Sequence, residues 1–213
     1  MFARHGSSTL AAIIALAGFS APAALLILGT STTTTGVAGG NGTDVVTLGP
    51  TGPYQGLTKV TWAEDSDIPC WFEVKSRHIN LNSVQSYQVD LGGSSCNQTS
   101  QSQREAGEAP SEHFINGISV CRNNQRIKGV KVFYARVHQP NGTLTSMTEY
   151  DWDFSAACDQ YGDGWSTERY CPTGRVATQL KIYHKSDTPA FSNNIKEAAT
   201  GIALVCRAVE VKP

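Results

Sequence analysis

Two kinds of side chain that hold sugars gather between residues 151 and 165 of this 213-residue chain. Carboxylates make planar hydrogen bonds to hydroxyl groups, and a rigid aromatic ring covers the apolar face of a sugar at a low ordering cost. The candidate carbohydrate-binding residues are Asp151, Trp152, Asp153, Tyr161, Asp163 and Trp165. The competing interpretation, which we favour, places both tryptophans in the core and the acids in turns.

Catalytic chemistry has weaker support in the sequence. A glycosidase needs two positioned carboxylates, and nothing selects a pair from Asp151, Asp153, Asp163 and Glu168. The chain has no G-x-S-x-G elbow, H-E-x-x-H pair or glycine-rich phosphate loop. Asp159 and Asp163 lack the full EF-hand pattern of calcium ligands. We therefore expect no catalytic residue, metal or cofactor, and a carbohydrate-active enzyme that uses acids near residues 151–168 is the alternative.

Six cysteines follow the N-terminal region, and an even number in an exported chain favours disulfides. They are Cys70, Cys96, Cys121, Cys158, Cys171 and Cys206. Zinc is the competing use, but the chain has neither a CxxC nor an HxxxH pair. We expect all six cysteines to be structural, with a pairing that the sequence does not choose.

Three N-x-S/T sequons begin at Asn41, Asn97 and Asn141. They are candidate N-glycosylation sites in a protein that passes through a eukaryotic secretory path. The sequons also fit the abundance of Asn and Thr in this chain, so they add little to the prediction of export.

The first 40 residues differ in composition from the rest. Arg4 and His5 precede an apolar run over residues 10–28, and a linker rich in Thr and Gly follows. This order is typical of a signal peptide, and a membrane anchor is the alternative. Ala21-Pro22-Ala23 has the form of a cleavage site, although cutting there would leave residues 25–28 exposed. We expect a secreted, extracellular protein, which contacts a membrane only if the segment stays uncleaved.

The charge of the chain is nearly balanced, with 17 Lys and Arg against 18 Asp and Glu. This balance excludes a nucleic-acid binder that relies on a basic face. It also gives no reason to expect a strongly charged polymer as partner.

Strand patterns dominate the chain after residue 45, and no segment there predicts a long amphipathic helix. Alternating apolar and polar residues between turn-rich links predict strands. The predicted strands are 57–63, 70–75, 77–82, 84–90, 113–121, 126–138, 144–150, 176–184 and 201–211. A short turn is expected within 192–200, and 94–110 is predicted to be an exposed loop. The pattern indicates an all-β sandwich, barrel or prism.

Three cysteines indicate an internal repeat, because Cys70, Cys121 and Cys171 are 51 and 50 residues apart. Similar triplets follow them at 79–81, 130–132 and 180–182, and residues 116–122 resemble 200–207. Three sheets packed around one axis would each bury one face, so no repeat needs to be stable alone. We predict an all-β fold, a β-prism with pseudo-threefold symmetry and three sheets of about four short strands.

The predicted boundaries follow from this repeat. Residues 1–40 are the signal peptide or membrane anchor with its linker, and residues 41–213 are a single domain. Within that domain the three repeats cover about 57–105, 106–158 and 159–213.

The last repeat carries four motifs, Gly164-Trp165, Cys171-Pro172-x-Gly174, Leu180-x-Ile182 and Gly201-Ile202-x-Leu204-x-Cys206. In this order they resemble the repeat signature of the vitelline membrane outer layer protein I family. The first repeat lacks the Cys-Pro-x-Gly turn, and residues 193–200 replace the acidic stretch of the family. The resemblance implies a secreted, disulfide-bonded β-prism of extracellular coats, similar to the prisms of some lectins. The implied partners are glycans or extracellular matrix components, and a structural or protein-interaction module without a sugar site is the second alternative.

Overall fold

The computed structural model of the protein consists of β-strands in three antiparallel sheets. It describes residues 25–65, 68–91, 104–106, 108–123, 126–138, 141–154, 164–187 and 196–212. Among these residues there is no helix long and apolar enough to cross a membrane.

Two sheets take all their strands from one stretch of the chain, and the third joins both ends. Sheet B contains β4 (Gln55–Asp65), β5 (Ile68–His78), β6 (Val84–Asp90) and β7 (Arg104–Ala106). Sheet C contains β8 (His113–Asn123), β9 (Arg126–His138), β10 (Thr143–Phe154) and β11 (Arg169–Tyr170). Sheet A contains β1 (Leu25–Thr34), β2 (Ala38–Gly39), β3 (Asp44–Leu48), β12 (Arg175–Asp187) and β13 (Lys196–Lys212).

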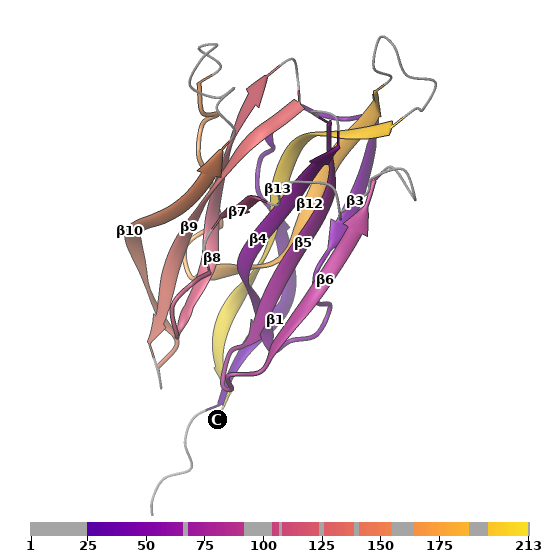
Figure 1. The fold of residues 1–213 in the computed structure, drawn as a ribbon. Coiled ribbons are helices and arrows are strands. Elements are labelled where there is room, and N and C mark those ends of the chain that lie inside the picture. Colours follow the sequence, from indigo (N-terminus) through magenta and orange to yellow (C-terminus); the bar gives the residue numbers. More distant parts are fainter. Residues whose placement is uncertain are drawn as a thin grey trace, which may run out of the picture.

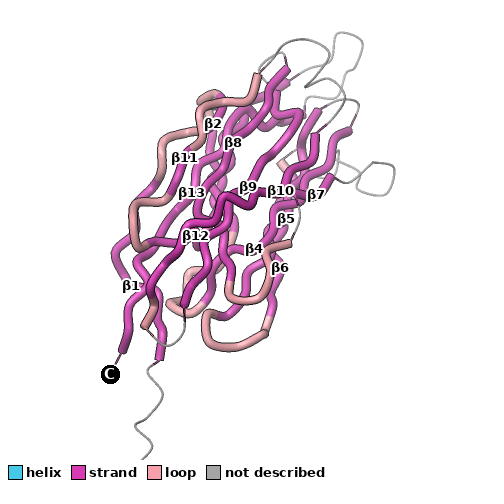
Figure 2. Tube along the Cα trace, turned by 90° about the vertical axis from the view of Figure 1, so that its left-hand side faces the viewer, coloured by secondary structure: helices cyan, strands magenta, loops and turns pink. Residues whose placement is uncertain are grey.

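The three sheets share one strand order. The order is β6-β5-β4-β7 in sheet B, β10-β9-β8-β11 in sheet C and β1-β13-β12-β3 in sheet A (Figure 1). In sheets B and C three consecutive strands form a meander and the fourth returns beside the first, which is a Greek key. In sheet A the strands equivalent to the first and second of the Greek key are β12 and β13. The strands equivalent to its third and fourth are β1 and β3. Figure 2 shows β1, β13 and β12 on one face of the molecule.

Bulges fall at equivalent places in the three sheets. The first strand of each sheet has one extra residue against its partner strand: Thr58, Asn116 and Thr178. The second strand has one extra residue further along the same pair: Cys70, Lys128 and Thr200. A bulge bends the strand and increases its twist. Because both bulges recur in register, the three sheets curve alike and enclose a common interior.

The core lies between the two bulges of each sheet. Two directly opposed apolar pairs come from every sheet: Val60–Val74 and Trp62–Phe72 in B, Ile118–Val132 and Val120–Val130 in C, and Leu180–Leu204 and Ile182–Ile202 in A. All twelve side chains are fully buried and belong to one cluster. One cluster fed by three sheets is the core of a β-prism, so the predicted fold class is confirmed.

The cysteine spacing that suggested the repeat does not mark equivalent positions. Cys70 is a bulge residue of β5, Cys121 lies on β8, and Cys171 follows β11. The equivalent residues are instead Thr58, Asn116 and Thr178, whose spacing is wider. The boundary predicted at residue 159 is also displaced, because β11 pairs with β8 in sheet C.

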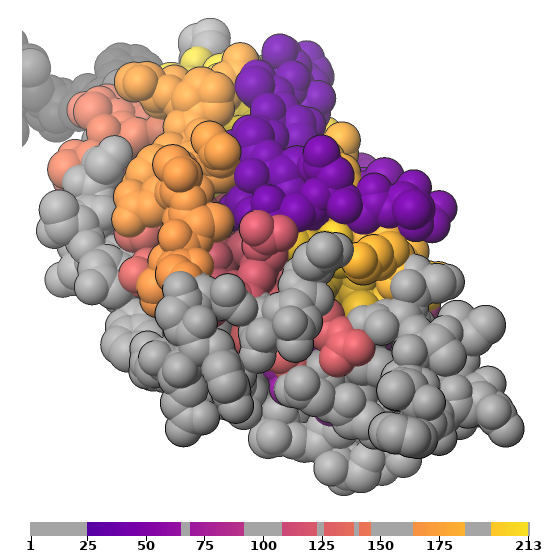
Figure 3. Space-filling model, turned by 90° about the horizontal axis from the view of Figure 1, so that it is seen from above, coloured from indigo at the N-terminus to yellow at the C-terminus, as the bar shows by residue number. Residues whose placement is uncertain are grey.

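The N-terminal segment is part of the domain, and the expected linker is wrong for residues 25–40. These residues include β1 and β2, and β1 pairs with the last strand of the chain. Leu26 and Leu28 alternate into the interior and are buried, whereas Leu25 is exposed. The domain therefore begins before residue 41. The apolar run predicted as a signal peptide or anchor covers residues 10–28, so its last four residues belong to β1, and residues 1–24 lie outside the described residues. Seen from above, the indigo N-terminal segment lies beside the orange segment (Figure 3).

Most predicted strands are confirmed, with three corrections. Residues 79–82 follow β5 as a turn and do not form the predicted strand. β7 forms inside the predicted loop 94–110, and residues 196–200 belong to β13 where a turn was expected. Short edge strands such as β7 carry little alternation of their own, because pairing with a neighbour stabilises them.

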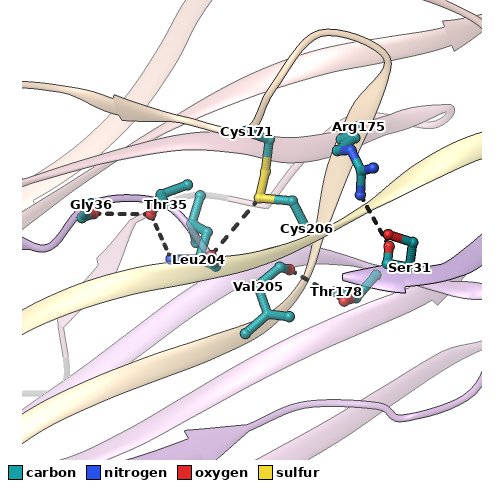
Figure 4. The surroundings of a disulfide bond; sticks show 9 residues. All are labelled: Ser31, Thr35, Gly36, Cys171, Arg175, Thr178, Leu204, Val205 and Cys206. Atoms are coloured by element: carbon teal, nitrogen blue, oxygen red, sulfur yellow. Dashed lines mark hydrogen bonds between the residues drawn. A yellow bond between two sulfur atoms is a disulfide. The ribbon is translucent and has the colours of Figure 1, made fainter. Parts of the chain in front are cut away.

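One disulfide joins two sheets. Cys171, just after β11, is bonded to Cys206 on β13, and their Cα atoms are 5.7 Å apart (Figure 4). Cys70 and Cys121 are also disulfide-bonded, and the described part of the chain has no free cysteine. Cys96 and Cys158 lie outside the described residues.

Candidate functional site

Arginines hydrogen-bond the connecting segment at two of the three corners at which one sheet leads into the next. Residues 49–54 lead from sheet A to sheet B, and residues 108–112 lead from sheet B towards sheet C. Arg77 on β5 donates to the carbonyl oxygens of Pro110 at 2.7 Å and Ala109 at 2.9 Å. Arg207 on β13 donates to the carbonyl oxygen of Gly52 at 3.2 Å. Each arginine thus ties the second strand of its sheet to the connection beside it.

The third corner has an alanine in the same register position. Arg77 pairs with Gly56, Arg207 with Val176, and Ala135 with Phe114, and each of these first-strand partners is two residues before the first bulge residue. A methyl group cannot reach the connection at residues 171–174. A cleft of about 240 Å³ opens there, which we call the Ala135 cleft. Its lining includes Asn116, Ala135, Leu144, Tyr170, Cys171 and Arg175.

Asn116 places a buried acceptor in this cleft. Its backbone carbonyl accepts from the Cys171 amide at 2.6 Å, and only 7% of the residue is exposed. The side-chain Oδ1 is buried and has no hydrogen-bond partner within the described chain. The two equivalent threonines differ, because Thr58 and Thr178 donate to the carbonyl oxygens of Lys75 and Val205. Leaving a buried polar group unpaired costs about 1–3 kcal/mol, so Asn116 carries an unsatisfied acceptor at the border of this cleft.

The wall of the Ala135 cleft is held at several points. The disulfide fixes Cys171, and Arg175 donates to the carbonyl oxygen of Ser31 on β1 at 3.0 Å (Figure 4). The Arg175 amide donates to the Pro172 carbonyl at 3.1 Å. Gly174 has a φ of 76°, a left-handed conformation that glycine adopts without steric cost. This wall is therefore preorganised, which lowers the ordering cost of binding.

Tyr170 forms the exposed side of the cleft. Its ring packs against Phe133, with centroids 5.1 Å apart, and lies over Gly117, where any Cβ would come within 2.5 Å of the ring. Glu168 accepts a hydrogen bond from the Tyr170 hydroxyl at 2.7 Å. Partial burial, followed by this hydrogen bond and the charge of Glu168, raises the pKa of Tyr170 to about 12. The ring is 47% exposed, so it offers a fixed aromatic surface to solvent.

An aromatic row continues from the cleft across sheet C. We define it as Tyr170, Phe133, Lys131 and Trp165. Lys131 and Phe133 are two residues apart on β9 and so share a face. The Lys131 Nζ lies 4.5 Å from the centroid of the Trp165 ring, a cation–π distance. A backbone bridge between Trp165 and Cys121 fixes the start of this segment.

The predicted sugar-binding residues fall into two groups. Trp165 belongs to the aromatic row, and the β10 register sets Trp152 opposite Lys131. The same register sets Asp151 and Asp153 opposite Val132 and Val130 of the core pairs. Tyr161 and Asp163 lie outside the described residues, as does Asp159 of the rejected calcium pattern.

Sequence reasoning missed Asn116, Ala135 and Tyr170. The only signal that could have found them was the contrast between Arg77, Arg207 and Ala135, and that contrast is visible only once the strand register is known. Of the sequon asparagines, Asn41 and Asn141 are exposed, and Asn97 lies outside the described residues.

Comparisons with known proteins give structural likeness alone. No family model and no curated protein matches the sequence, so the vitelline membrane resemblance stays a prediction. A wild-type Malaysian banana lectin is similar over 84% of this chain and 99% of its own, with a TM-score of 0.47 and 12% identity. The biofilm matrix protein Bap1 of V. cholerae is similar over 88% of this chain and 27% of its own, with a TM-score of 0.38 and 9% identity.

Proposed function

We propose that this protein is a secreted component of an extracellular coat or matrix and binds glycans through the Ala135 cleft and the aromatic row. One observation carries the proposal. At the corner where Ala135 takes the register position of Arg77 and Arg207, the described residues line a cleft, and the buried Oδ1 of Asn116, one of those lining residues, lacks a partner among them. A ligand that brings hydroxyl groups satisfies this acceptor.

The chemistry of the cleft suits one sugar ring. Asn116 accepts from a hydroxyl group, and the Tyr170 ring covers an apolar ring face, its hydroxyl being held by Glu168. The volume of about 240 Å³ is below the range of drug-sized pockets, so a single ring fits better than a large ligand. One neutral hydrogen bond contributes about 0.5–1.5 kcal/mol. A single sugar would therefore bind weakly.

The aromatic row extends the contact along a glycan chain. Phe133 is buried beneath Tyr170, and Lys131 and Trp165 lie beyond it, so a further sugar unit of one chain meets the Trp165 ring. Aromatic surfaces add contact area with little loss of rotamer freedom. The proposed ligand is thus an oligosaccharide or polysaccharide rather than a free monosaccharide.

Secretion is part of the same proposal. The apolar leader predicted before residue 25 and the disulfides fit an oxidising compartment outside the cytosol.

A glycan array probed with the secreted protein tests this function, and Ala135→Arg is the decisive variant. Arginine there should reach the connection at 171–174, as Arg77 and Arg207 do at their corners, and fill the cleft. We expect glycan retention to fall at least tenfold while the fold remains. Gln88→Arg on the exposed side of β6 is the matched control for added charge.

The outcomes separate the competing functions. Unchanged retention by Ala135→Arg would move the sugar site away from this cleft. No retention by the wild-type protein would favour the structural module, and turnover of a bound oligosaccharide would favour the enzyme.

A further inference from the structure

A second cleft lies on sheet B and shares no lining residue with the Ala135 cleft. It has a volume of about 480 Å³ and lies between residues 49–54 and the strands β5 and β6. The rings of Tyr54 and His78 stack in it, with centroids 5.3 Å apart and planes 11° from parallel. We call it the Tyr54 cleft.

Its polar groups form one hydrogen-bonded set. The Tyr87 hydroxyl donates to Oε1 of Gln85 at 2.7 Å and lies 3.2 Å from Oε1 of Gln55. Ser76 also donates to Oε1 of Gln55, at 2.8 Å. Both amide oxygens are therefore occupied, and each planar amide turns its nitrogen away from its oxygen's partners. Gln55 and Gln85 thus line the cleft with side-chain amides whose oxygens are held by Tyr87.

The lining carries no fixed charge. Of the residues around the Tyr54 cleft none is Asp, Glu, Lys or Arg. The Nδ1 atom of His78 accepts from the Asn80 amide at 3.1 Å, which places the proton of the neutral ring on Nε2. Stacked rings and amide donors without an ionic partner suit an uncharged ligand that is rich in hydroxyl groups.

The cleft continues past His78. An adjoining cleft of about 480 Å³ shares His78 as a wall and is lined further on by Asn82 and Ser111 and by two charged residues, Arg77 and Glu112. Asn80 holds the turn between them, because its side chain exchanges two hydrogen bonds with the backbone of Leu26 at 3.1 and 2.6 Å. Together the two clefts have room for more than one sugar unit.

We infer that the Tyr54 cleft is a second binding site, for an uncharged oligosaccharide, and that the protein bridges separate glycan chains. This inference rests on the proposed function, since bridging needs the Ala135 cleft as the other site. Two sites on one rigid domain raise the effective affinity for a polymer without any new contact. They also convert a binder into a cross-linker of a matrix.

Titration calorimetry with chitotetraose, cellotetraose and mannotetraose measures the number of sites on the secreted protein. We expect at least one of these probes to bind at two sites per chain. Tyr54→Ala and Ala135→Arg should each leave one site, and the double variant none. The Tyr54 carbonyl accepts from the Ile79 amide, and this bond survives loss of the ring. Gln85→Ala, at an exposed position, should weaken the second site at least fivefold and guards against misfolding of Tyr54→Ala.

Each result decides between the two proposals. One site that Ala135→Arg abolishes and Tyr54→Ala spares would overturn the inference and leave the proposed function standing. One site that only Tyr54→Ala abolishes would relocate glycan binding and overturn bridging. Binding of none of the three probes would overturn the second site. Agglutination of tetrasaccharide-coated beads by the wild-type protein, and by neither single variant, would support bridging.

Discussion

Ala135 and Arg77 occupy equivalent positions on the second strands of sheets C and B, yet only Arg77 reaches the corner beside it. The register makes the comparison independent of any sequence similarity between the sheets. A symmetric framework with one substituted corner gives a direct way to separate stability from binding, because each corner is a control for the others.

Removal of the arginine from a closed corner should destabilise the fold. Arg77→Ala loses the bonds to Pro110 and Ala109, and a hydrogen bond from a charged donor contributes about 1.5–3 kcal/mol. We expect the free energy of unfolding to fall by about that amount in urea titration. Arg136→Ala is the control, since its ion pair with Glu112 is exposed and should contribute about 0–1 kcal/mol. Equal losses in both variants would contradict this account of the corners.

Replacement of Asn116 by threonine, the residue at the equivalent bulge in the other two sheets, should stabilise the protein. Asn116→Thr removes the buried, unpaired Oδ1, and a threonine hydroxyl there can donate as Thr58 and Thr178 do. We expect a gain of about 1–3 kcal/mol in unfolding free energy together with weaker glycan retention. The reverse change, Thr58→Asn, should lower stability. A destabilised Asn116→Thr would show that Asn116 has a structural role instead.

The Tyr170 hydroxyl should lose its proton at a higher pH than an ordinary tyrosine. Its pKa is raised to about 12 by burial and then by Glu168, against about 10 for a free tyrosine. A raised pKa means that the folded state favours the protonated ring, so its stabilisation is complete below pH 10 and is lost as the pH rises from about 10 to 12. Ultraviolet titration of tyrosinate should show the late group, and Glu168→Gln should lower its pKa. An unmoved titration curve in Glu168→Gln would argue against the hydrogen bond.

The disulfide should matter for both the wall of the cleft and the fold. Replacement of Cys171 and Cys206 by alanine frees the connection after β11 from β13. Loss of a native disulfide costs about 2–5 kcal/mol in small secreted domains. We expect a lower melting temperature and a proportionally larger loss of glycan retention, measured where the variant is still folded. Retention equal to wild type would show that the wall needs no disulfide.

The first strand should be required for folding. Leu28→Ala removes a buried side chain and should cost about 2–5 kcal/mol, whereas Leu25→Ala, at an exposed position, should cost little. Denaturant unfolding compares the two. Mass spectrometry of the exported protein should find an N-terminus before Leu25, because the strand begins there. A mature chain that lacks Leu26 would contradict the pairing of β1.

Alternation in the sequence was enough to predict most strands, because half-buried strands must alternate. It failed for β1, where residues 25–28 are all apolar and continue the leader without a break. Only pairing with β13 shows that Leu26 and Leu28 point inward. The even spacing of three cysteines predicted three sheets, and three sheets are present. The three cysteines nevertheless lie at positions that are not equivalent in the strand register.

The candidate site was harder to predict, for a physical reason. Trp165 could be proposed because a large ring near acids is a visible signal. Ala135 acts through what it lacks, and a missing side chain has no motif. Asn116 looks like an ordinary strand residue until the bulge and its unpaired oxygen are known.

The pairing of β1 with β13 also governs when the fold can be completed. β1 is the first described strand and β13 the last, so their contacts span nearly the whole chain. Sheet A stays open until β13 has been made, and such distant contacts form slowly. During that interval Leu26 and Leu28 have no partner strand. A nearly finished prism then exposes the apolar side chains of β1, and this late closure is the step at which assembly is most exposed to aggregation.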